Sequence, residues 1–180
     1  MCKSMTVRIY FLRFSWATEI TDHVERALTV FSDTNADRKD RENHINANLM
    51  SEENRVELPE FECVTVSDLT HILHTVQHES GIFIFPFQYP IDAWAISGQD
   101  YSMEYDRVLD IVRDQNFRTR SRAICICGSP IDRLMNNRID EPYLVRDWSE
   151  KSFSLWIQKP QNEWDVVLAI EYILARDMYP

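Results

Sequence analysis

Glycine is scarce in this chain of 180 residues, which has only three glycines, Gly81, Gly98 and Gly128. Average usage near 7% would supply about 12. Phosphate-binding loops, dinucleotide fingerprints and nucleophile elbows each need two or more glycines within a few residues. The sequence therefore excludes all three, and we find no other catalytic motif. It favours a non-catalytic protein without a cofactor.

Long uncharged runs are also missing. The longest in the middle of the chain, Ser80–Ile91, has 12 residues and contains prolines, so it is too short to span a bilayer. Arg8 and Arg13 interrupt the first apolar run, which argues against a signal peptide. We therefore expect a cytoplasmic protein whose four cysteines are reduced thiols.

Positive charge is scarce between residues 56 and 106. The whole chain has 29 acidic and 19 basic side chains and a net charge of −10. Residues 56–106 contain nine acidic side chains and no Lys or Arg, so they carry −9 of this charge. Such a balance disfavours binding to nucleic acid or to an anionic membrane. A basic protein is the predicted partner.

The same span is rich in aromatic side chains, and an acidic rim around aromatic anchors is typical of a protein interface. The alternative is that the aromatics form the core and the acids a solvated face. On the first interpretation the protein is an acidic inhibitor of the immunity or anti-defence type, which occludes a basic partner. The predicted partner-binding residues are Asp92, Trp94, Asp100, Tyr101, Glu104, Asp106, Asp110 and Asp114.

Apolar periodicity indicates strands and helices that alternate along the chain. Alternation predicts one α/β domain over residues 1–180, a three-layer sandwich whose mixed, mainly parallel sheet has helices on both faces. Residues 32–56 lack apolar period and read as a long polar loop, with disorder favoured. The final helix, Asn162 to about Arg176, is apolar nearly all round and is expected to be largely buried. The expected strands are 5–14, 61–66, 81–87, 93–97, 122–127 and 153–158.

A second candidate site lies after the apolar strand Arg122–Cys127. Open α/β sheets bind ligands at the carboxyl edge of their strands, where Gly98, Cys127, Gly128 and Ser129 are expected to meet. This supports the alternative function, a small enzyme or nucleotide-ligand binder. The simpler interpretation of Cys127 is apolar packing, because unpaired cysteines are among the most buried residues.

Three histidines share one face of the helix expected over residues 68–79. They are His71, His74 and His78, and the opposite face is apolar, so we expect them in solvent. His74 and His78 have the spacing to share Zn²⁺, but a solvated surface is favoured and no metal site is predicted. A homo-oligomer that joins residues 56–106 to the arginine-rich residues 107–146 is a third functional interpretation.

Overall fold

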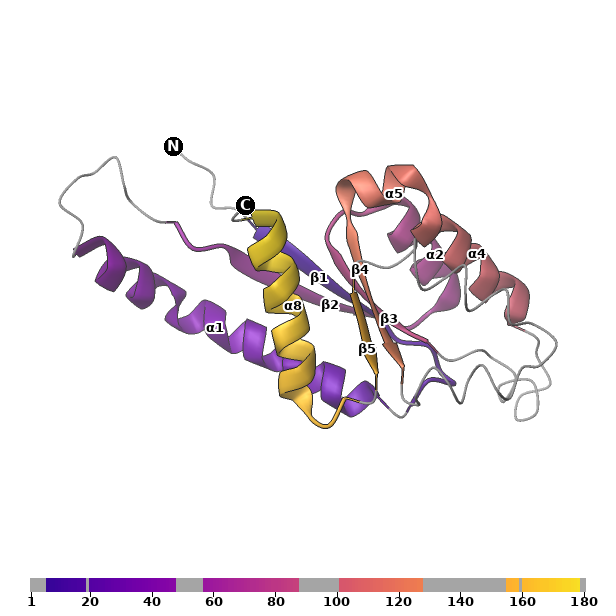
Figure 1. The fold of residues 1–180 in the computed structure, drawn as a ribbon, viewed down its shortest axis with the longest axis horizontal. Helices are drawn as coiled ribbons and strands as arrows, with labels where there is room; N and C mark the ends of the chain where they lie inside the picture. Colours follow the sequence, from indigo (N-terminus) through magenta and orange to yellow (C-terminus); the bar gives the residue numbers. More distant parts are fainter. Residues whose placement is uncertain are drawn as a thin grey trace.

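The computed structural model describes residues 6–18, 20–47, 57–87, 101–127, 155–158 and 160–178 (Figure 1). Within these ranges five strands form one sheet in the order β2-β1-β3-β4-β5, and every neighbouring pair is parallel. The strands are β1 (Thr6–Leu12), β2 (Glu60–Val66), β3 (Ile82–Pro86), β4 (Arg122–Cys127) and β5 (Leu155–Gln158). The expected strand at 93–97, which was to supply the antiparallel element, lies outside the described residues.

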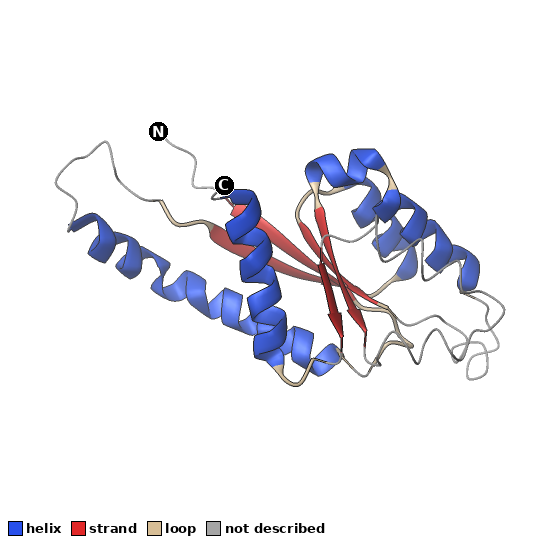
Figure 2. Cartoon of the chain, viewed as in Figure 1, coloured by secondary structure: helices blue, strands red, loops and turns tan. Residues whose placement is uncertain are grey.

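Helices cover both faces of this sheet (Figures 1 and 2). One face carries the helices α1 (Thr21–Ala47) and α8 (Glu163–Met178). The other carries α2 (Leu69–His78), α4 (Ser102–Arg113) and α5 (Gln115–Arg120). The predicted three-layer α/β sandwich is therefore confirmed.

The central strands β3 and β4 are buried on both faces, as strands of a parallel sheet usually are. Their side chains alternate between two cores. Phe83, Phe85 and Cys125 pack toward α2 and α4. Ile84 and Ile124 pack toward α1 and α8. Strands without a polar face can fold only if each layer of helices is in place.

Gly81 lies where the chain enters β3 beside β1. A Cβ atom at this position would collide with the backbone carbonyl oxygen of Arg8. The side chain of Arg8 links the same segments further, since it forms ion pairs with Glu62 of β2 at 2.7 Å and with Glu79, two residues before Gly81, at 2.9 Å. This glycine is therefore required by the close approach of two chain segments.

The polar segment that was expected to be a loop is largely helical, and that prediction is wrong for residues 32–47. α1 has 27 residues and continues to Ala47, and its second half extends beyond α8 (Figure 1). Apolar period is absent there because that half does not pack across the face of the sheet and touches it only at the edge strand β2. Residues 48–56 lie outside the described part of the chain.

Asn35 ties the second half of α1 to the sheet. Its amide nitrogen donates to the carbonyl oxygen of Phe61 at 2.6 Å, and its amide oxygen accepts from the Phe61 backbone N–H at 2.9 Å. The side chain thus pairs with the outer edge of β2 as another strand would. Arg38, one turn further on, donates to the carbonyl oxygen of Leu58 at 3.1 Å.

Replacing Asn35 should therefore destabilise the protein. Asn35→Ala leaves two half-buried backbone groups without partners, which costs about 1–3 kcal/mol of unfolding free energy. The matched control is Asn43→Ala, because Asn43 is an exposed asparagine of the same helix. Urea unfolding followed by circular dichroism measures both variants. Equal stability of the two would contradict the role assigned to Asn35.

Candidate functional site

The strand order places a topological switch point between β1 and β3, because the chain winds outward in opposite directions from these two strands. Doubly wound sheets bind ligands outside the carboxyl ends of the strands at such a point. Here the relevant segments are residues 13–16 after β1, 67–68 after β2 and Phe87 after β3. Tyr101 at the start of α4 completes this edge.

Aromatic side chains fill the switch point. Phe14 is 2% exposed and stacks on Trp16, with ring centroids 4.9 Å apart. Trp16 stacks in turn on Tyr101 at 5.3 Å. Phe85 and Tyr105 meet Phe14 edge-on from the other side, at 5.5 and 5.3 Å. The crevice where a polar ligand would lie is thus occupied by the protein's own rings.

A cavity of about 210 Å³ remains beside these rings, lined in part by Ser15, Ser67, Asp68 and Tyr101. Its one carboxylate is already used, because an Asp68 oxygen accepts from the His71 N–H at 2.9 Å and caps α2. Asp68 is therefore the N-cap residue of α2, where the sequence offers the neighbouring Ser67 as well. Among the described residues no group of three or more His, Cys, Asp or Glu side chains gathers around one point.

The thiol of Cys127 lies at the predicted ligand edge but is fully buried, with 0% exposure. Cys125 is buried beside it in the core formed with α2 and α4. Burial raises the pKa of the Cys125 thiol, and the neighbouring Cys127 raises it further. The structure shows apolar packing at Cys127. Its expected companions Gly98, Gly128 and Ser129 lie outside the described residues.

Four aromatic side chains of the span that was expected to form an acidic interface are buried. Phe83, Phe85, Phe87 and Tyr105 are all in the core. Acids of the same span are paired: Glu62 and Glu79 bind Arg8, and Glu79 also accepts from the Tyr10 hydroxyl at 3.2 Å. Asp92, Trp94 and Asp100 lie outside the described residues.

Three of the predicted partner-binding residues, Asp106, Asp110 and Asp114, have the i, i+4, i+8 spacing of one helix face, but the structure does not place them on one helix. The helix breaks at Asp114, whose backbone is extended and whose carboxylate accepts from the Asn116 N–H at 2.7 Å, so it caps α5. Aspartate is a strong N-cap residue, which explains the break. Asp110 remains exposed and lies 3.9 Å from Arg113. Glu104 and Asp106 are half-buried.

Arg118 and Arg120 of α5 bind carbonyl oxygens of their own chain. Arg120 donates to the carbonyl oxygens of Val76 and Gln77, at 2.6 and 2.9 Å, at the end of α2. Arg118 donates to the carbonyl oxygen of Arg113 at 2.7 Å. These guanidinium groups therefore stabilise the turns around α2 and α5 within the chain.

The outer face of α8 is the largest departure from expectation. Trp164, Leu168 and Tyr172 are 55%, 61% and 54% exposed, at a spacing that aligns them along one side of the helix. The opposite side, including Val166, Ile170 and Ile173, is buried against the sheet. The prediction of a largely buried helix is therefore wrong for this stripe, which we call the α8 outer face.

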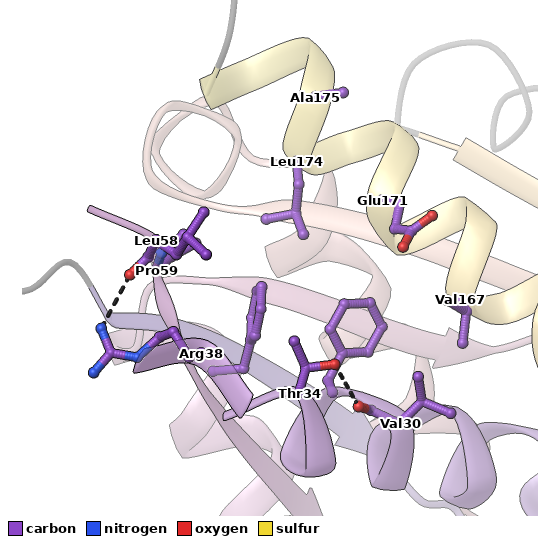
Figure 3. Close-up of a pocket in the computed structure, with 11 residues that line it drawn as sticks. Val30, Thr34, Arg38, Leu58, Pro59, Val167, Glu171, Leu174 and Ala175 are labelled. Carbon is purple, nitrogen blue, oxygen red and sulfur yellow. Dashed lines mark hydrogen bonds between the residues drawn. The ribbon is translucent and has the colours of Figure 1, made fainter. Parts of the chain in front are cut away.

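A groove runs beside the C-terminal half of this face, between α8 and α1 (Figure 3). Its volume is about 300 Å³. Val167 and Leu174 reach into it from α8, Val30 and Thr34 line it from α1, and Leu58 closes one end (Figure 3). Glu171 and Ala175 lie on its rim and are exposed next to the α8 outer face. The groove and the α8 outer face could not be predicted from the sequence. The residue pattern shows that this helix is apolar on nearly every side, but it does not show which side the sheet covers.

Comparison with known proteins finds a similarity to solved structures. No family model matches the sequence, and no curated protein is similar to it. The crystal structure of a phosphorylated cyanobacterial phytochrome response regulator, RcpA, aligns with 97% of this chain and 95% of its own, with 12% identity and a TM-score of 0.44. None of the helices in the described residues is long and apolar enough to cross a membrane.

The prediction of an acidic inhibitor of immunity or anti-defence type is wrong. That hypothesis needed the aromatic side chains of residues 56–106 at the surface, but Phe83, Phe85, Phe87 and Tyr105 of this span are in the core.

The two cysteines of β4 should be inert in the folded protein. Burial raises the pKa of Cys125, and thiolate is the reactive form, so a disulfide reagent should modify both thiols only after unfolding. Half-buried Cys63 should react earlier. Because the unfolded thiol ionises near its ordinary pKa of 9.0 while the folded Cys125 stays protonated, stability should fall as pH rises above about 9.

The order in which the cysteines react is measured by timed labelling, without guanidinium and in denaturing guanidinium, followed by peptide mapping. If Cys127 of the native protein were labelled at the same rate as Cys63, this would contradict the burial of β4 and favour a ligand site at the end of that strand.

Proposed function

We propose that this chain is a protein-interaction domain that forms a two-fold symmetric homodimer through the α8 outer face. The observation that carries the proposal is the row of exposed Trp164, Leu168 and Tyr172. Single exposed apolar side chains are ordinary on a protein surface, whereas a contiguous apolar row marks an interaction site. The oligomer differs from the one expected between residues 56–106 and 107–146.

A second copy of the chain fits the α8 outer face because one end of this face carries a projecting side chain and the other end carries a groove that can receive it. Trp164 projects near the N-terminal end, and the groove opens near Leu174 at the other end. These positions are ten residues apart, about 15 Å along the helix. When two copies of α8 cross antiparallel, each Trp164 reaches the groove of the other copy. Such a self-complementary arrangement is what a two-fold interface requires.

The position of Leu168 supports the same arrangement. It lies almost midway between Trp164 and the groove, so the two-fold axis passes near it and the two leucines meet. Helices that pack through residues four apart are the commonest class of helix pair in globular proteins. Trp and Tyr at the ends of the row are the side chains that carry most binding energy in interfaces.

Charge along α8 favours the antiparallel direction. Glu163 and Asp165 lie in the first turn, and Arg176 lies in the last turn, where its guanidinium is 5.9 Å from the ring of Tyr172. An antiparallel crossing brings Arg176 toward the acidic first turn of the other copy, whereas a parallel one places like ends together. Electrostatic complementarity of this kind fixes the orientation of a complex.

Leu168→Asp should convert the dimer to a monomer, because it places two carboxylates at the two-fold axis within an apolar contact. The matched control is Met103→Asp. Met103 is 67% exposed on α4, on the opposite side of the sheet, so its replacement should leave the dimer intact. Sedimentation equilibrium of the full chain measures the mass of all three proteins.

Circular dichroism should show the same fold in the parent and both variants, because neither side chain is part of a core. A parent chain that stays monomeric at high micromolar concentration would overturn the proposal. So would a dimer that Leu168→Asp leaves unchanged.

A further inference from the structure

The histidines of α2 supply a site that the proposed dimer does not use. All three are exposed, and α2 lies on the face of the sheet opposite to α8. His74 and His78 are one turn apart, and their ring centroids are 4.6 Å apart with the ring planes tilted by 50°. His71 is seven residues from His78, about 10 Å along the helix, and cannot join the same pair.

The geometry points to a binding site for one divalent transition-metal ion, of the zinc, nickel or copper type, held by His74 and His78. Imidazole nitrogen is a preferred ligand of these ions and not of Mg²⁺ or Ca²⁺. Two rings at one-turn spacing and in contact bring their nitrogens within reach of one ion with rotamer changes alone. Exposure lets the ion enter and leave.

The helix that carries the pair is held firmly at both ends. Asp68 caps its first turn through the His71 N–H. Arg120 binds the carbonyl oxygens of Val76 and Gln77 beside His78, and Val76 is fully buried. Since the backbone is already ordered, metal binding needs only the two imidazole side chains to be fixed. Ligands carried on rigid elements bind more tightly for this reason.

The site has two protein ligands within the part of the chain that the structure describes. The nearest acidic neighbour in sequence, Glu79, is bound to Arg8 and to the Tyr10 hydroxyl. Among described residues no third His, Cys, Asp or Glu completes a cluster. The remaining coordination positions therefore belong to water, as in metal sites that keep open positions.

Calorimetric titration of the full chain with NiCl₂, and separately with ZnCl₂, tests the site. The parent should bind one ion at this pair, and both His74→Ala and His78→Ala should lose that binding. The matched control is His71→Ala, which removes an exposed histidine from the same helix and should bind as the parent does. A Cys63→Ser background removes the half-buried thiol as a competing ligand.

Thermal unfolding gives an independent readout, because an ion that binds only the folded protein raises the melting temperature. The rise on adding NiCl₂ should appear in the parent and in His71→Ala and vanish in His78→Ala. All variants should melt alike without metal, since the three side chains are exposed. Binding that survives in His78→Ala, or that His71→Ala abolishes equally, would overturn the site.

Discussion

The burial of β3 and β4 on both faces is the constraint on which the rest of the structure depends. Neither strand has a polar side, so the sheet is stable only between two complete layers of helices. Phe83 and Phe85 require α2 and α4, and Ile84 and Ile124 require α1 and α8. The aromatic side chains at the carboxyl edge, Phe14 among them, belong to the same packing and lie where doubly wound sheets usually bind ligands.

With the core and the sheet edge occupied by packing, the outer surfaces of the helices are the parts of the described structure that are available for binding. The inner side of α8 is committed to the sheet, while its outer side presents Trp164, Leu168 and Tyr172 to solvent. On the other face, α2 buries Ile72 and Val76 and turns His74 and His78 outward. Each layer thus has one face fixed by the core and one face available for binding.

The sequence predicted most of the fold because the strands and α2 carry clear apolar periods. Arg122–Cys127 matches β4, and the final helix begins where expected, directly after Asn162, whose side-chain oxygen accepts from the Trp164 N–H at 2.9 Å. The second half of α1 has no such period, since side-chain hydrogen bonds of Asn35 and Arg38 hold it rather than an apolar face. Helical period also could not show which side of α8 the sheet covers, or that Asp114 would cap a new helix. The candidate surface therefore emerged only from the packing.

Oxidative cross-linking of a Leu168→Cys variant tests the antiparallel α8 pairing most directly, because Leu168 is the residue closest to the proposed two-fold axis. If two copies of α8 pair antiparallel, a disulfide between them should form rapidly at residue 168 under mild oxidation. Met103→Cys, similarly exposed on the opposite side of the sheet, should form little disulfide between copies. Equal cross-linking of the two variants, or none at residue 168, would contradict the dimer.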